Sequence, residues 1–223
     1  MSEKKIKVVL IGESGVGKTN LIRVAIGESF ESHTESTLSS SFFESEIIYK
    51  NKKYNYSLWD TAGQEVYRSL NKIFIMDSKI VIVVFAINNK KSYEQVDFWI
   101  NYAKEILTEG NYIMALVGNK SDLYEEQKIS DEEMIKKAED NKIKFKLTSA
   151  REDPVGFTEF LEALLKDFIN NIGFKKSENE KNITLEDKKD EEMNENDGKD
   201  VKKKNKKKIL LIRQEKNFIK KKV

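Results

Sequence analysis

A glycine-rich octapeptide after the first apolar run constrains the fold more than any other stretch of the chain. It spans Gly12 to Thr19, with the sequence G-E-S-G-V-G-K-T, and the apolar run Ile6 to Ile11 precedes it. The pattern G-x-x-x-x-G-K-[ST] between a strand and a helix start predicts a loop whose backbone N–H groups cradle the phosphates of a nucleoside triphosphate. Glycine lacks a Cβ atom, so this backbone can take unusual dihedral angles close to a phosphate. We expect the nucleotide to contact Gly12, Ser14, Gly15, Val16, Gly17, Lys18, Thr19 and Asn20.

Two side chains at the end of this loop add a charge and a metal ligand. Lys18 can reach the β and γ phosphates, so we predict a catalytic as well as a binding role for it. The hydroxyl of Thr19 is placed to ligate Mg²⁺. The octapeptide alone predicts a nucleoside triphosphate site and leaves the base undefined.

Length and composition indicate one folded domain followed by a charged tail. The chain has 223 residues, of which 39% are hydrophobic, enough for one α/β domain over residues 1–174. Residues 175–223 should form a disordered tail, because they are charged and poor in large apolar side chains. There is no cysteine and no apolar run of about 18 residues. We therefore expect a cytoplasmic protein.

Apolar patterning along the chain predicts a sheet with helices between its strands. Apolar runs at 5–11, 79–87, 112–117 and 143–147 are typical of buried parallel strands, and Phe42 to Tyr49 and Tyr54 to Asp60 should form a hairpin joined by residues 50–53. The fold class is α/β, with a six-stranded, mostly parallel sheet, one antiparallel edge hairpin and about five flanking helices.

Helix starts and a helical stripe complete the predicted domain. A helix should follow the phosphate loop from Lys18 to Ala25, and capping boxes at Ser92 to Gln95 and Ser130 to Glu133 should start two more. The last helix should turn one apolar side to the core, because eight residues recur at spacings of three and four. These are Phe157, Phe160, Leu161, Leu164, Leu165, Phe168, Ile169 and Ile172.

The second hairpin strand ends in a segment with the residues for phosphate hydrolysis. Trp59 to Glu65 has the sequence W-D-T-A-G-Q-E. We expect Asp60 to hold the Mg²⁺ shell and Gly63 to offer its backbone N–H to a γ-phosphate. Gln64 can orient an attacking water, as a glutamine does in GTPases.

Two later segments predict which base is bound. Asn119 to Asp122 has the sequence N-K-S-D, and the carboxylate of Asp122 can accept hydrogen bonds from both N1–H and the exocyclic amine of guanine. Adenine lacks this pair of donors, so the site should select guanine strongly. Other residues should support the base: Asn119 can brace the phosphate loop, Lys120 can lie over the ring and Phe30 can cover its other side. After the sixth strand, Ala150 can present its backbone N–H to the guanine carbonyl oxygen, with Ser149 and Arg151 on either side of it.

With these four motifs in order, the sequence resembles the Ras-like small GTPases, and among them the Rab branch. The resemblance extends from about Lys5 to Ile172. It implies a P-loop GTPase (G) domain, a monomer that alternates between GTP and GDP, hydrolyses GTP slowly with Mg²⁺ and works in vesicle trafficking on endomembranes. It also implies an exchange factor, a GTPase-activating protein and effectors, and it gives no role with nucleic acid. Thr37 matches the family's switch threonine, which ligates Mg²⁺ and contacts the γ-phosphate.

Several departures from the Rab pattern keep a second function open. The switch threonine is followed by Leu38-Ser-Ser-Ser41, and Val66 stands where an arginine is usual. The chain could therefore be a GTP-binding interaction module that does not cycle and is recruited through its tail. Rabs end in prenylated cysteines, and this sequence has none.

The tail carries the basic surplus of the chain. Residues 199–223 hold 12 Lys or Arg against 2 acidic residues. We weigh three interpretations: a solvated structureless tail, a surface anchor for an anionic membrane, and, with less weight, a nuclear import signal.

Overall fold

The computed structural model describes residues 5–32, 41–61, 68–107 and 111–171. The chain divides into two units, of which Met1–Ile172 is compact, and residues 173–223 lie outside the described residues. Thr37, Gly63 and Gln64 also lie outside them. The roles predicted for these three residues and for the tail stay predictions.

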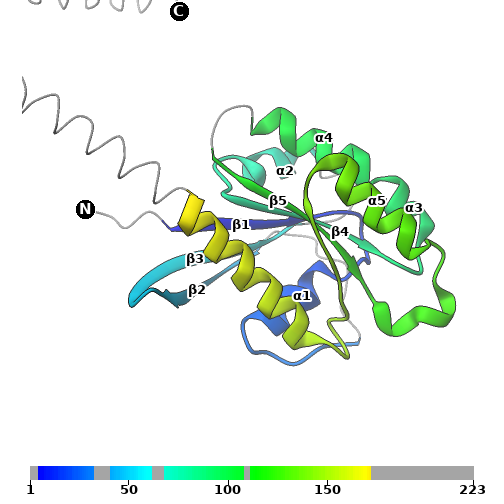
Figure 1. The fold of residues 1–223 in the computed structure, drawn as a ribbon, viewed down its shortest axis with the longest axis horizontal. Coiled ribbons are helices and arrows are strands. Elements are labelled where there is room, and N and C mark those ends of the chain that lie inside the picture. The colour runs from blue at the N-terminus through cyan, green and yellow to red at the C-terminus, as the bar shows by residue number, and fades with distance from the viewer. Residues whose placement is uncertain (1–4, 33–40, 62–67, 108–110, 172–223) are drawn as a thin grey trace, which may run out of the picture. The chain divides into compact units, whose positions relative to one another are not determined.

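Six strands within the described residues form one sheet, shown in Figure 1. They are β1 (Ile6–Ile11), β2 (Ser41–Tyr49), β3 (Lys52–Asp60), β4 (Ile80–Ala86), β5 (Ile113–Asn119) and β6 (Lys144–Leu147). The spatial order is β2-β3-β1-β4-β5-β6, and only the β2–β3 pair is antiparallel. The predicted fold class is confirmed, including the antiparallel hairpin at one edge.

Helices cover both faces of the sheet because the central strands are apolar on both sides. The helices are α1 (Lys18–Ala25), α2 (Arg68–Ile75), α3 (Lys90–Glu94), α4 (Val96–Ile106), α5 (Asp131–Asn141) and a last helix over residues 154–171. On one face Val8 and Leu10 of β1 join a core with α1 and the last helix. On the other face Val9 and Ile11 join a core with α2, α4 and α5 (Figure 1). This two-sided burial follows the strand period of two.

The hairpin turn is shorter than predicted. The four residues from Lys50 to Lys53 were expected to form the connection, but Tyr49 already pairs with Lys52 in the β2–β3 ladder. Only Lys50 and Asn51 form the turn, and both are left-handed, with φ of 50° and 59°. Two left-handed residues match the twist of the flanking strands, so a two-residue turn closes the hairpin.

One of the two predicted capping boxes is wrong and the other is confirmed. Helix α3 begins before Ser92, with Asn89 as its N-cap; the Asn89 side chain accepts a hydrogen bond from the Ser92 amide at 3.2 Å. The Ser92 hydroxyl is buried and accepts from the Ala86 amide at 3.1 Å, so it fastens α3 to β4. Ser130 and Glu133 form the predicted capping box at the start of α5.

The last helix begins where the only proline of the chain stands. Pro154 is its first residue, a position where the missing N–H costs no helical hydrogen bond. The Asp153 carboxylate accepts from the Gly156 amide at 2.9 Å and so satisfies one N–H of the first turn. The predicted stripe packs against the core from Phe157 to Ile169, whereas Ile172 lies outside the described residues. No helix in the described part combines the length and apolar character needed to cross a bilayer.

Candidate nucleotide site

The glycines of the phosphate loop are required by close packing and by left-handed backbone. Gly12, Gly15 and Gly17 have φ of 142°, 74° and 94°. A Cβ at Gly12 would lie 2.1 Å from the carbonyl oxygen of Val84, and one at Gly17 would lie 2.4 Å from Nδ2 of Asn119. Nothing lies within 4 Å of a Cβ built on Gly15. The loop is therefore packed on its inner side and open at Gly15, where an anion can approach the backbone.

Helix α1 presents its N-terminus to the same place. Gly17 is the N-cap and makes no side-chain cap hydrogen bond, and the first turn contains no acidic residue. The first intrahelical bond runs from the Leu21 amide to the Gly17 carbonyl at 3.0 Å. The amides of Lys18, Thr19 and Asn20 precede it and have no acceptor inside the helix. Together with the helix dipole they favour a bound phosphate.

Lys18 lies folded over the phosphate loop. Its side chain is 5% exposed, and Nζ donates to the carbonyl oxygens of Gly12 and Glu13, both at 2.9 Å. Burial lowers the pKa of Lys18 to about 8, and the nearby carboxylates of Asp60 and Glu13 oppose this change. Like these carboxylates, a bound phosphate would stabilise the charged ammonium and raise the pKa of Lys18. The buried lysine is therefore suited to an anionic ligand.

A contact that the sequence did not reveal holds Glu13 in the loop. The indole Nε1 of Trp99, in α4, donates to Oε1 of Glu13 at 3.0 Å. Trp99 is 1% exposed, so the core of the domain fixes it. Because the Glu13 carbonyl receives Lys18, this hydrogen bond ties α4 to the part of the loop that positions the lysine.

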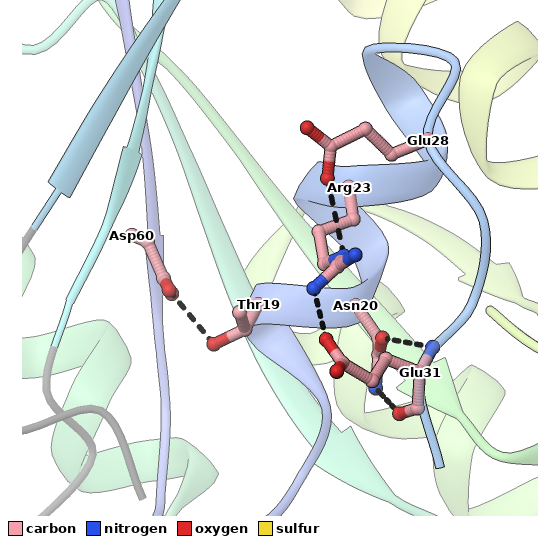
Figure 2. A network of polar contacts seen from close by, with 6 residues as sticks. All are labelled: Thr19, Asn20, Arg23, Glu28, Glu31 and Asp60. Carbon is pink, nitrogen blue, oxygen red and sulfur yellow. Dashed lines mark hydrogen bonds and ion pairs between the residues drawn. The ribbon is translucent and has the colours of Figure 1, made fainter. Parts of the chain in front are cut away.

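Thr19 and Asp60 form the part of the site that suits Mg²⁺. The Thr19 hydroxyl donates to Oδ2 of Asp60 at 2.7 Å, and Asp60 is 1% exposed (Figure 2). The described residues contain no group of three or more His, Cys, Asp or Glu side chains able to hold a metal. Mg²⁺ commonly takes one or two carboxylates and completes its octahedron with phosphates and water. One hydroxyl and one carboxylate beside a phosphate loop therefore fit this ion.

The Asn20 side chain has a structural role that limits how it can bind a nucleotide. Its Nδ2 donates to the Glu31 carbonyl at 2.9 Å, and its Oδ1 accepts from the Glu31 amide at 3.0 Å (Figure 2). Arg23 forms ion pairs with Glu28, at 3.2 Å, and with Glu31. Only the backbone amide of Asn20 remains for the predicted phosphate contact. The anchored segment holds Phe30, which is 38% exposed.

Asn119 joins the phosphate loop to the base-reading segments. Its side chain is 2% exposed; Nδ2 donates to the Val16 carbonyl at 2.8 Å, and Oδ1 accepts from the Ala150 amide at 3.2 Å. The bond to the Val16 carbonyl is the brace to the phosphate loop that the sequence predicts. The Ala150 amide, expected to contact the guanine carbonyl, is engaged with Asn119 in this structure. Sequence reasoning missed this second bond because it links side chain and backbone across 31 positions.

Asp122 is held by a serine from the neighbouring segment. The Ser149 hydroxyl donates to Oδ1 of Asp122 at 2.5 Å and accepts from the amides of Arg151 and Glu152 at 3.1 and 3.0 Å. Lys120 has a left-handed backbone with φ of 65°, which turns the chain after β5. Ser149 is therefore a positioning residue for the carboxylate, a role the sequence did not assign.

These parts meet at the carboxyl ends of the parallel strands. The phosphate loop follows β1, Asp60 ends β3, Asn119 ends β5, and the Thr148 to Arg151 segment follows β6. Ligands of doubly wound sheets bind outside these carboxyl ends. The fold, together with the phosphate loop and the residues gathered at these strand ends, defines a P-loop nucleotide-binding protein.

Comparison with known proteins gives the family. The Ras family model matches residues 7–170. A relative from Arabidopsis thaliana, Ras-related protein RABF2a, is 36% identical over 147 residues, which are 65% of this chain and 72% of the relative. The chain belongs to the Ras family of small GTPases and is Rab-like within it. Proteins of this family bind GTP and GDP, usually with Mg²⁺, and hydrolyse GTP.

An aromatic cluster also forms on the surface of the domain. Phe42 stacks on Trp59 with ring centroids 5.0 Å apart, and Trp59 lies 5.7 Å from Phe74. Phe42 is 54% exposed, and Nζ of Lys7 lies 4.6 Å from the Trp59 ring centroid. The β2–β3 pairing places Phe42 opposite Trp59, so the hairpin register creates the cluster.

Proposed function

We propose that the chain is a Rab-like switch that binds GTP and GDP with Mg²⁺, hydrolyses GTP slowly and acts in membrane trafficking. The observation that carries the proposal is the Asn119 side chain, which bonds both the phosphate loop and the Ala150 amide. A generic phosphate loop does not require such a brace. A site that must hold a base and its phosphates at a fixed separation does.

Guanine selection rests on Asp122. Its Oδ1 is fixed by Ser149, so the carboxylate is oriented before any base arrives. Two neighbouring donors on guanine match a carboxylate, and adenine would leave the acid unpaired at a cost of about 1–3 kcal/mol or more. GTP and GDP are therefore the proposed ligands.

Hydrolysis requires charge stabilisation and a placed water. Thr19 and Asp60, with Thr37 as a third proposed ligand, would hold Mg²⁺, which would neutralise charge developing on the phosphates. Lys18 would leave its two carbonyl partners and donate to the β and γ phosphates, while the backbone of Gly63 would donate to the γ-phosphate. Gln64 would orient the attacking water.

The test of the hydrolytic role is Gln64→Leu. We expect GTP affinity within about twofold of the parent and single-turnover hydrolysis slower by at least about tenfold, because leucine cannot orient water. Gln127→Leu is the matched control: this glutamine donates to the Ile129 carbonyl, away from the phosphate loop. Equal hydrolysis rates in the Gln64 variant and the parent would remove the proposed role.

Regulators and effectors are expected partners. The phosphate loop contains no arginine that could stabilise the transition state from within. We therefore propose a GTPase-activating partner that supplies one or reorders Gln64, with rate gains of about 10³ to 10⁵. The proposed effector surface is the cluster of Phe42, Trp59 and Phe74. An effector would bind it more tightly in the GTP-bound form of the protein than in the GDP-bound form.

The non-cycling interaction module is the alternative, and Leu38-Ser-Ser-Ser41 is the feature that keeps it open. Single-turnover hydrolysis measured with and without a cell extract separates the two functions: acceleration by the extract supports a switch, and no turnover in either condition supports the module.

Whether the chain is a switch or a module, residues 199–223 are proposed to bind an anionic membrane surface. Co-sedimentation with anionic and neutral vesicles, with and without residues 199–223, tests that attraction.

A further inference from the structure

A lysine-lined depression lies at the end of the sheet remote from the nucleotide site. It has a volume of about 440 Å³ and is bordered by the starts of β5 and β6, the ends of α4 and α5, and the last helix. Its polar lining includes Lys104, Tyr112, Asn141, Lys142, Lys144 and Asp167. We call it the amino-end pocket, because parallel strands place it opposite the carboxyl ends that hold the nucleotide motifs.

Three lysines converge on this pocket from three different elements. Lys104 lies in the last turn of α4, Lys142 is the C-cap of α5, and Lys144 opens β6. The backbone of Lys142 is fixed, because its amide donates to the Ala138 and Glu139 carbonyls and its φ is 55°. Regular elements rather than a long loop therefore set the spacing of the three lysine backbones.

Among the described residues, one carboxylate, that of Asp167, lines the pocket and only partly offsets this charge. Asp167 pairs with Lys144, and the two side chains are 36% and 54% exposed. An ion pair this wet contributes little and can exchange partners readily. The Lys104 ammonium makes a long hydrogen bond, 3.4 Å from Nζ to Oδ1 of Asn141. The phenol of Tyr112 adds a neutral donor beside the ammonium groups, whereas Nδ2 of Asn141 already donates to the Lys137 carbonyl at 3.0 Å.

We propose that the amino-end pocket binds a multiply phosphorylated anion, the headgroup of a phosphoinositide. Several oxygens on one small ring match ammonium groups that arrive from several directions, whereas a single carboxylate would engage only one or two. Asn171, where the described part ends, also lines the pocket, and the chain continues from there toward the basic segment 199–223. The proposal rests on the membrane role above for the source of the ligand; soluble inositol phosphates share the chemistry.

The experiment uses the full chain loaded with GDP and two probes. One probe is soluble inositol trisphosphate, measured by calorimetry. The other is phosphatidylcholine vesicles containing phosphatidylinositol bisphosphate, compared with phosphatidylserine vesicles of equal total charge. Tight binding of the soluble headgroup identifies a soluble polyphosphate ligand, and binding only in the bisphosphate vesicles identifies a lipid. Binding to neither, or equal binding to both kinds of vesicle, would overturn the proposal.

A matched pair of triple variants locates the effect. Lys104→Gln, Lys142→Asn and Lys144→Gln together should weaken headgroup binding about a hundredfold, since each lysine contributes roughly fivefold. Asparagine at position 142 tolerates the left-handed backbone. The control changes the exposed Lys91, Lys128 and Lys136 to glutamine, with the same loss of charge. Equal weakening by both triples would show non-specific attraction and refute the pocket.

Two further measurements keep the test decisive if the triple variant folds poorly. Asp167→Asn removes the competing carboxylate, so headgroup binding should tighten about fivefold; unchanged or weaker binding would count against the site. In the unaltered chain, bound headgroup should protect Lys104 and Lys144 from chemical acetylation more than Lys91 and Lys136. GDP affinity, and vesicle binding after removal of residues 199–223, are measured in parallel. If the chain binds GDP and loses vesicle binding without these residues, while the pocket variants have no effect, the pocket proposal is refuted and the proposed switch stands.

Discussion

The two halves of the nucleotide site are built by different means. The phosphate half is made of backbone: three left-handed glycines, helix amides and two carbonyls that receive Lys18. The base half is made of short side chains: buried Asn119 accepts from the Ala150 amide, and buried Ser149 donates to the half-buried Asp122. A phosphate is recognised by its charge, which amides supply in any sequence that can take the shape. A base is recognised by its edge, which only particular side chains can match.

Gly12→Ala should have the largest effect, because the phosphate half depends on shape. Its Cβ would meet the Val84 carbonyl oxygen, which belongs to a central strand and cannot move aside. We expect the free energy of unfolding, measured by urea titration at fixed GDP, to fall by about 4 kcal/mol. Gly15→Ala is the control, with positive φ but open space, and should cost only about 1–2 kcal/mol. Equal losses would show that strain rather than contact governs the loop.

Asp122→Asn should alter which base is bound while leaving the phosphate half intact. An amide can accept from one base donor and must present an N–H toward the other, so guanine should lose about a hundredfold in affinity, or about 2.7 kcal/mol. Xanthine, which carries an oxygen in place of the amine, should gain. Competition between GDP and xanthosine diphosphate measures both, with the exposed Asp140→Asn as control. An unchanged preference for guanine would contradict the role of Asp122.

Asn119→Ala tests the link between the halves. It removes the bonds to the Val16 carbonyl and the Ala150 amide and leaves buried groups without partners, at a cost of about 2 kcal/mol in unfolding free energy. GDP affinity should fall by about tenfold or more. The control, Asn88→Ala, removes one exposed 3.3 Å hydrogen bond to Glu126 and should change neither quantity measurably. Should both variants unfold at the same urea concentration, the link is energetically unimportant.

The smallest effect concerns the pH dependence of phosphate binding. The pKa of Lys18 is about 8 in the free protein, against 10.5 for an unperturbed lysine, and bound phosphates should raise it. Titration of Lys18 should therefore leave GDP affinity unchanged below pH 8. Above pH 8 it should lower GDP affinity by up to about tenfold per pH unit. Binding near pH 9 should take up a proton, seen by calorimetry in buffers of different ionisation enthalpy.

Guanine itself also titrates in alkaline solution, so Lys18→Met provides the baseline for this measurement. The difference between parent and variant isolates the lysine. The same pKa has a consequence for stability: burial of the ammonium destabilises the free fold below pH 8, and this penalty disappears as the pH rises toward 10.5. Identical proton uptake in both proteins would mean that Lys18 is not the titrating group.

Contiguous motifs made most of the fold and site predictable. Phosphate-loop glycines, the Asp60 strand end and Asn119 to Asp122 lie in short segments whose chemistry depends on near neighbours, and the described ones meet at one sheet edge. Contacts between distant segments were not predictable: Trp99 reaches Glu13 across 86 positions, and Ser149 reaches Asp122 across 27. The lysines of the amino-end pocket form no motif at all, because only the packing of α4, α5 and β6 brings them together.

One side chain, Asn119, touches the backbone of both halves, at Val16 and at Ala150. Guanosine and inorganic pyrophosphate, added as separate molecules, would therefore bind to two sites that share the Asn119 side chain. The fragment that binds first should restrict the motion of Asn119, so the second fragment should bind more tightly than it does to the free protein.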